Sequence, residues 1–110
     1  MKNLFLLLVF LSLHSQSLYS TQADSLRLTW ENEKLTDSLR FGALDEFHNL
    51  FSLVFPDSTL KVLDYYHDLA KSKGADRQVY RAAVRKGNIL RYQDLIEEAR
   101  THYYEALIVA

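Results

Sequence analysis

The 110-residue chain is predicted to be an all-α protein in which antiparallel helical hairpins follow a signal peptide helix. Residues that break helices are rare, since the chain has only three glycines and one proline. Along residues 37–110, apolar side chains recur at steps of three and four, the spacing that places them on one face of a helix. The joins between these segments are short, so neighbouring helices should run antiparallel. The length allows one small domain.

Residues 1–20 are predicted to be a signal peptide that is removed from the mature protein. Lys2 supplies a positive charge, residues 4–13 are apolar except for Ser12, and a small polar stretch follows. Spanning a bilayer takes about twenty apolar residues, so this shorter run favours a cleaved leader over a permanent anchor. Residues that could precede the cleaved bond are Ser17, Ser20 and Ala23.

Composition argues against several kinds of partner. The chain has no cysteine, so it can form no disulfide and no thiolate metal site. It has 13 basic and 14 acidic side chains, and loss of Lys2 with the leader leaves 12 against 14, a net charge of −2. This balance gives no reason to expect nucleic acid or an anionic membrane as a partner. Membrane attachment is expected only through a segment outside this chain.

A linker that includes a short helix over 24–34 is predicted for residues 21–36, and four longer helices for residues 37–110. Gly74 can take the left-handed conformation that ends the second of these helices. Leu50 and Val54 are expected on the buried face of the first helix, and Leu107 on that of the last. With their candidate N-caps, the helices are expected over 37–54 (Thr36 or Asp37), 57–73 (Asp57 and Ser58), 76–92 (Asp76) and 95–110.

Small residues recur in the last two helices where close packing would need them. Gly87 and Ala99 have little or no side chain, so the two backbones can approach where they cross. Tyr103 is expected to fill the wedge beside the crossing, and Ala106 to keep the last helix close to the helix that comes next. Glycine costs a helix interior ~1 kcal/mol relative to alanine, so Gly87 indicates a packing requirement.

This pattern resembles a tetratricopeptide repeat, the helix–turn–helix unit of about 34 residues that builds α-solenoids. The resemblance implies a short solenoid of about two repeats over residues 37–110, the last one incomplete or uncapped. A weaker upstream copy has Thr59 in the role of Ala99, 40 residues earlier. The chain departs from the pattern at Lys86, where leucine is usual, and at Leu90, where tyrosine is usual.

The mature chain also resembles the exported N-terminal region of bacterial multi-domain sensors. In that family a leader is followed by tetratricopeptide repeats, a membrane helix and a cytoplasmic output domain, often a nucleotide cyclase or a histidine kinase. The resemblance implies a periplasmic location and no catalytic residue within the present chain. The runs that carry it are Leu28–Asn32, Thr36–Leu44, Phe55–Ser58 and Asp68–Gly74.

No catalytic, cofactor-binding or metal-binding residues are predicted. The histidines lack the close pairing that a zinc site needs, and the chain has no glycine-rich phosphate loop or nucleophile elbow. Arg77, Arg81 and Arg85 lie on one helical face, which is expected to be solvated more often than to bind an anion. Repeats of this kind generally bind through their first helices. The residues chosen for a groove surface are therefore Tyr80, Asn88, Arg91 and Tyr92.

The leading hypothesis is a non-enzymatic, exported module that binds a protein or peptide, as the sensory or scaffold part of a larger signalling protein. The alternative is the N-terminal fragment of a signalling enzyme, a cyclase or histidine kinase, whose catalytic domain lies beyond Ala110. A third interpretation is a secreted helical bundle without repeat function. The apolar run Ala106–Ala110 predicts an incomplete final repeat or self-association through the last helix.

Overall fold

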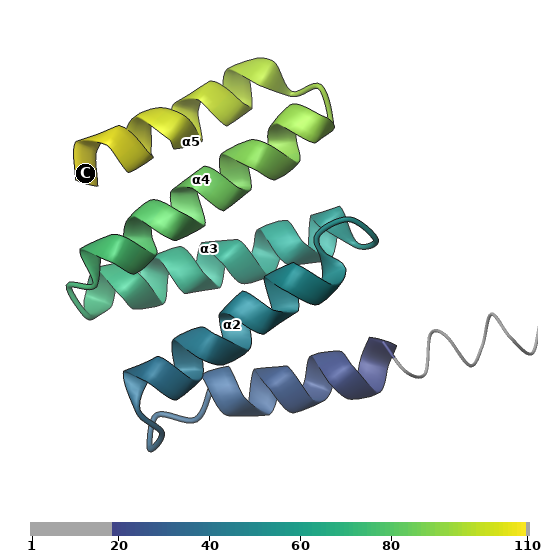
Figure 1. Cartoon of the computed structure of the whole chain (residues 1–110), viewed down its shortest axis with the longest axis vertical. Coiled ribbons are helices and arrows are strands. Elements are labelled where there is room, and N and C mark those ends of the chain that lie inside the picture. Colours follow the sequence, from purple (N-terminus) through teal and green to yellow (C-terminus); the bar gives the residue numbers. More distant parts are fainter. Residues whose placement is uncertain (1–18, 110) are drawn as a thin grey trace, which may run out of the picture.

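The computed structural model describes residues 19–109, and within this range every regular element is a helix. The all-α prediction is therefore confirmed. A helix over 19–30 comes first, and each later helix runs antiparallel to the one before it (Figure 1). The later helices are α2 (Asp37–Phe51), α3 (Pro56–Ser72), α4 (Asp76–Tyr92) and α5 (Ile96–Val109).

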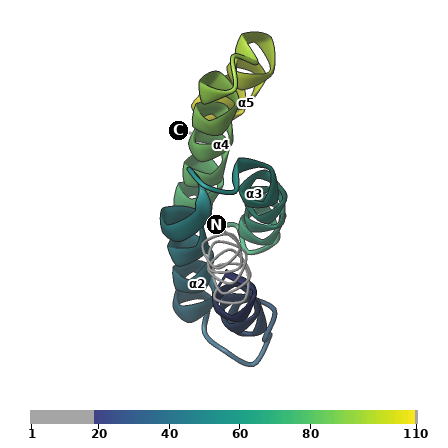
Figure 2. The same cartoon turned by 90° about the vertical axis from the view of Figure 1, so that its right-hand side faces the viewer.

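The helices fall on two sides of the molecule. Figure 2 shows α2 and α4 on one side, with the N-terminal helix and α3 on the other. Because α2 and α4 are parallel neighbours, their C-terminal ends lie at the same edge of the molecule (Figure 1). This alternation positions the candidate site described below.

The start of the described chain differs from the prediction. The helix covers residues 19–30 rather than 24–34, so it crosses the expected boundary between leader and linker at residues 20 and 21. Asn32 ends it with a turn in which its side-chain Oδ1 accepts a hydrogen bond from the Lys34 amide over 3.0 Å. The rest of the predicted signal peptide, residues 1–18, lies outside the described residues.

Local signals predicted some helix ends correctly. Thr36 caps α2, since its hydroxyl oxygen accepts a hydrogen bond from the Leu39 amide over 3.3 Å. Gly74 ends the α3 region with a φ of 64°, in the left-handed region. Asp57 and Ser58 are not a cap, because Pro56 already occupies the first position of α3. The fixed φ of proline suits that position, which needs no amide donor.

An aromatic cluster holds the N-terminal helix to α2. Trp30 is buried at the end of that helix and meets Phe47 edge to face, with ring centroids 5.5 Å apart. At the other end, the Tyr19 ring lies 4.8 Å from Phe51 and 4.1 Å from Phe55. The helix therefore belongs to the fold along its described length.

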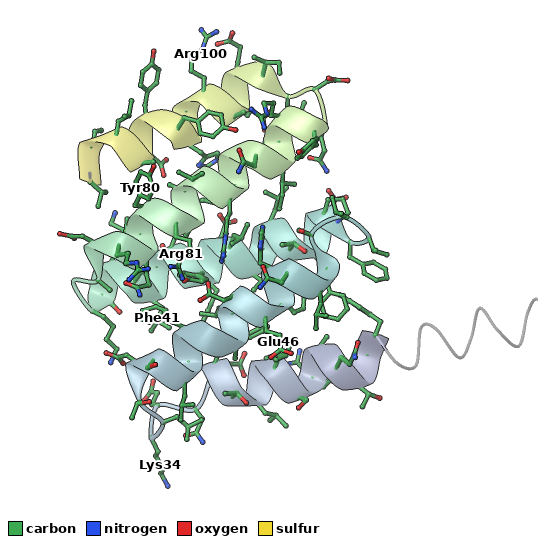
Figure 3. All side chains as sticks on the ribbon, in the orientation of Figure 1. Lys34, Phe41, Glu46, Tyr80, Arg81 and Arg100 are labelled. Atoms are coloured by element: carbon green, nitrogen blue, oxygen red, sulfur yellow. The ribbon has the colours of Figure 1, made fainter. Side chains whose placement is uncertain are left out.

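The buried face of α2 is rotated from the predicted one. Leu50 is exposed, and so is Val54, which lies in the turn after α2 rather than in the helix as predicted. Phe41 is instead buried and stacks on Tyr66 of α3 with centroids 5.5 Å apart (Figure 3). Arg40 is also buried, and its Nε donates a hydrogen bond to the Trp30 carbonyl over 2.8 Å. The residue periodicity identified a helix, but packing against the N-terminal helix and α3 decides which of its residues are buried.

Candidate functional site

The α4–α5 hairpin closes around Gly87. A Cβ atom on this glycine would lie 2.6 Å from Cε1, 2.8 Å from Cδ1 and 2.9 Å from Cζ of Tyr103. The tyrosine ring thus packs against Gly87, at the crossing of α4 and α5. Ala99 and Ala106 are both buried, as small interface residues should be. Glycine is needed here because no side chain would fit beneath the ring.

The apolar flank of α5 beyond this contact is exposed. Leu107, predicted to face inward, is largely exposed, as are Tyr104 and Ile108. Leu107 is wrong as a core residue because it lies on a side of α5 that no other helix covers within the described residues. Self-association through this flank stays a prediction of the sequence.

A hollow of about 350 Å³ lies where the C-terminal ends of α2 and α4 meet the start of α3. We refer to it as the α2–α4 groove. Two of the four residues predicted for a groove surface, Asn88 and Tyr92, line it. The full lining is His48, Ser52, Leu53, Pro56, Asn88, Ile89, Tyr92 and Gln93.

The other two predicted groove residues, Tyr80 and Arg91, are not part of this lining. They are eleven residues apart, so their directions around the axis of α4 differ by only about 20°. Both therefore lie on the same side of the helix, and Tyr92 lies on another side. Arg91 borders the groove, since its guanidinium carbon lies 5.7 Å from the centre of the Tyr92 ring. Tyr80 is half exposed near the opposite end of α4.

The α2 side of the groove was missed by sequence reasoning. His48 and Leu53 come from the end of α2 and the turn after it. The contact between α2 and α4 joins residues about 40 positions apart, and no local pattern encodes its register. The one available sign was the run of apolar residues around Leu53, which was interpreted as core.

A carboxylate on α2 fixes this register. Asp45 Oδ1 accepts hydrogen bonds from the Arg85 guanidinium over 2.7 Å and from the Tyr66 hydroxyl over 2.9 Å. Its Oδ2 accepts one from Arg81 over 3.0 Å (Figure 3). The expected solvated arginine face is therefore wrong for Arg81 and Arg85, because both reach across to α2. One side chain thus ties three helices together.

These contacts perturb the ionisation of the groups involved. Burial, together with the hydrogen bond to Asp45, raises the pKa of Tyr66 to about 12. Burial lowers the pKa of Arg81, but Asp45 and Tyr66 outweigh it and raise the value above its usual range. Burial, with Arg85 nearby, lowers the pKa of His48, which favours the neutral form of the imidazole in the groove.

A second polar cluster lies between α3 and α5. His67 Nε2 and His102 Nδ1 each lie 3.7 Å from Glu105 Oε2. Burial first, and the charge of Lys86 second, lower the pKa of His67. Lys86 is itself buried, with its ammonium 3.3 Å from an Asp64 oxygen, at the position where the repeat pattern usually has leucine. Within residues 19–109, no group of His, Asp or Glu side chains is arranged to hold a metal ion.

Comparison with protein-family models, with curated proteins and with solved structures finds no match for this chain. Across the described residues, no helix is both long and apolar enough to cross a membrane. The function is therefore argued from the geometry of the groove.

Proposed function

We propose that the protein is a non-enzymatic helical module that binds a protein or peptide segment in the α2–α4 groove. The observation that carries this proposal is the groove's uncharged, half-apolar lining. Leu53 and Tyr92 are 86% and 75% exposed, and exposed apolar side chains gathered at one hollow mark a surface that a partner can cover. They flank the hollow with Pro56 and Ile89, while amide, hydroxyl and imidazole groups supply hydrogen bonds.

The size of the groove favours a peptide anchor over a cofactor. Ligand pockets commonly measure about 300–1,000 Å³, so a hollow near the lower limit suits one or two side chains with their main chain. Extended or helical segments that bind in helical grooves place a few apolar anchors in this way.

The chemistry of the groove supports a binding role over a catalytic one. A nucleophile and its base must lie within hydrogen-bond reach of each other. Ser52 and His48 both line the groove, but the His48 ring contacts the Asn49 side chain, with Nδ1 3.4 Å from Oδ1. No hydrogen bond joins Ser52 Oγ to that ring in the described part of the chain.

We further propose that α2–α3 and α4–α5 are two tetratricopeptide-like repeats. Support comes from equivalent positions of the second helix in each pair. Thr59, in the role of Ala99, is fully buried, and Leu63, four residues later as Tyr103 is, is fully buried too. The ring of Tyr103 over Gly87 supplies the close helix contact that such a repeat requires.

Export to the periplasm, as part of a larger signalling protein, remains part of the proposal. The contacts of Tyr19 with Phe51 and Phe55 favour cleavage after Ser17, because the later cuts would remove this ring from the fold. The alternative, a fragment of a cyclase or histidine kinase, predicts a membrane helix and a catalytic domain encoded just downstream. Sequencing that DNA separates the two.

The binding proposal is tested by selecting 12-residue peptides on the full chain from a displayed random library. The selected peptide is then titrated against wild type, Tyr92→Ser and Tyr104→Ser. Tyr104 is the matched control, since it is 59% exposed on α5 and lies outside the groove. We expect Tyr92→Ser to weaken binding at least tenfold and Tyr104→Ser to leave it unchanged. Failure to select any peptide, or equal losses in both variants, would refute the proposal.

A further inference from the structure

We infer that Tyr103 is a positioning residue for the α2–α4 groove, and that the groove takes a peptide whose main-chain carbonyl accepts a hydrogen bond from Asn88. This inference rests on the proposed function. It connects the packing contact of the α4–α5 hairpin with a groove to which α5 contributes no lining residue.

The geometry begins at the Asn88 amide. Its Oδ1 accepts a hydrogen bond from the Tyr103 hydroxyl over 2.6 Å. The two branches of an asparagine amide differ. One branch is an oxygen, which accepts hydrogen bonds, and the other is an NH₂ group, which can donate two. With the oxygen held toward α5, the NH₂ group is the branch left for the groove, and it makes no hydrogen bond within residues 19–109.

The tyrosine reaches Asn88 because the preceding residue is glycine. The ring occupies the space that a Cβ on Gly87 would fill, with three ring carbons between 2.6 and 2.9 Å from that point. With its ring packed against Gly87, Tyr103 places its hydroxyl within hydrogen-bond distance of the next residue along α4. The Gly87–Asn88 pair therefore combines a packing position with a recognition position.

The surroundings of Asn88 define the ligand chemistry. Its neighbours in the lining include no Asp, Glu, Lys or Arg residue, and the Arg91 guanidinium at the border lies over the Tyr92 ring rather than in the lining. A ligand that covers the free NH₂ group should offer it a hydrogen-bond acceptor, and a ligand that covers the adjacent Ile89 and Tyr92 should offer them an apolar side chain. A main-chain carbonyl next to a Leu-like residue supplies both.

The test compares Tyr103→Phe with Tyr104→Phe. The first keeps the ring over Gly87 and removes only the hydroxyl, and the second is an exposed tyrosine whose hydroxyl makes no hydrogen bond in the described range. The probe is the selected 12-residue peptide in two forms, one C-terminally amidated, which removes the terminal carboxylate, and one with a free C-terminal acid. We expect Tyr103→Phe to lower the affinity for the amidated peptide about fivefold, and Tyr104→Phe to leave it unchanged.

A double-mutant cycle isolates the positioning role. Asn88→Ala should weaken the peptide by a similar factor, and adding Tyr103→Phe to it should cost nothing more. Independent, multiplicative losses would overturn the inference, as would wild-type affinity in Tyr103→Phe. If only the free-acid peptide binds, the acceptor for Asn88 is a terminal carboxylate and not a main-chain carbonyl, and the inference is wrong.

A measurement without ligand separates this inference from the proposed function. In wild type, nuclear Overhauser contacts should join the Asn88 NH₂ protons to His48 or Tyr92, and they should weaken in Tyr103→Phe but not in Tyr104→Phe. Contacts from that NH₂ group to the Tyr103 ring instead would mean that the amide is reversed, and the inference would be wrong even if peptides bind.

Discussion

Replacement of Gly87 by alanine tests the hairpin contact with a built-in control at Gly42. Both glycines lie inside helices, where alanine is favoured by ~1 kcal/mol. A Cβ on Gly42 would meet nothing within 4 Å, whereas one on Gly87 would meet the Tyr103 ring at 2.6 Å. Gly42→Ala should therefore stabilise the fold by the full ~1 kcal/mol of helix propensity.

The same methyl group at Gly87 must displace the ring, which its hydrogen bond to Asn88 resists. Overpacking a filled contact costs about 1–3 kcal/mol. After the gain in propensity, Gly87→Ala should leave a net loss of about 0–2 kcal/mol. The two variants should thus differ by about 1–3 kcal/mol, and each 1 kcal/mol shifts the melting temperature by about 4–8 °C in a domain of this size.

Urea and thermal unfolding followed by circular dichroism measure this difference. A second arm places Gly87→Ala in a Tyr103→Ala background, where the obstacle is gone and alanine should regain its advantage. If Gly87→Ala stabilises the wild type as much as Gly42→Ala does, the ring does not restrict position 87 and the reasoning is refuted.

Three further predictions follow from the polar contacts and the leader. Asp45→Asn should destabilise the fold by about 1–3 kcal/mol in urea unfolding, because two arginines lose their charged partner. Replacement of the exposed Glu46 by Gln is the control and should change the free energy of unfolding by no more than about 0.5 kcal/mol. Equal effects of the two variants would contradict the role of Asp45 in joining α2 to α4. The pKa values of His48 and His67 are lowered in the folded state, so the unfolded chain binds protons more readily and stability is lost as pH falls below about 6.5. His67→Gln should reduce the loss of stability with falling pH, measured as the free energy of unfolding in urea at several pH values. An unchanged pH dependence would mean that other groups cause the loss. Under the proposed export, mass spectrometry of the mature protein should give an N-terminus at Leu18, and a start at Thr21 or Asp24 would contradict the role of Tyr19.

Local features of the fold could be predicted from the sequence because their causes lie within a few residues. Thr36 is followed by the amide that it caps, and Gly74 ends a helix whose last turn is cationic. Gly87 stood out because glycine inside a helix needs a reason. The expected cap at Asp57 failed at this same level, since Pro56 starts the helix one residue earlier.

Long-range contacts could not be predicted. Arg81 and Arg85 have the spacing of a solvated face, and only the fold brings them to Asp45, 36 and 40 positions away. The groove shows the same limit. Asn88 and Tyr92, predicted from one helix, line the hollow, but their partners on α2 depend on a register set by Asp45.

The most direct test of the central claim maps the peptide onto the protein by NMR. Backbone amide shifts of the full chain are followed as the selected amidated peptide is added. We expect the largest changes at the residues of the α2–α4 groove, from His48 to Leu53 and from Asn88 to Gln93. Changes centred instead on Tyr104, Leu107 and Ile108 of α5 would place binding on the open flank and contradict the account.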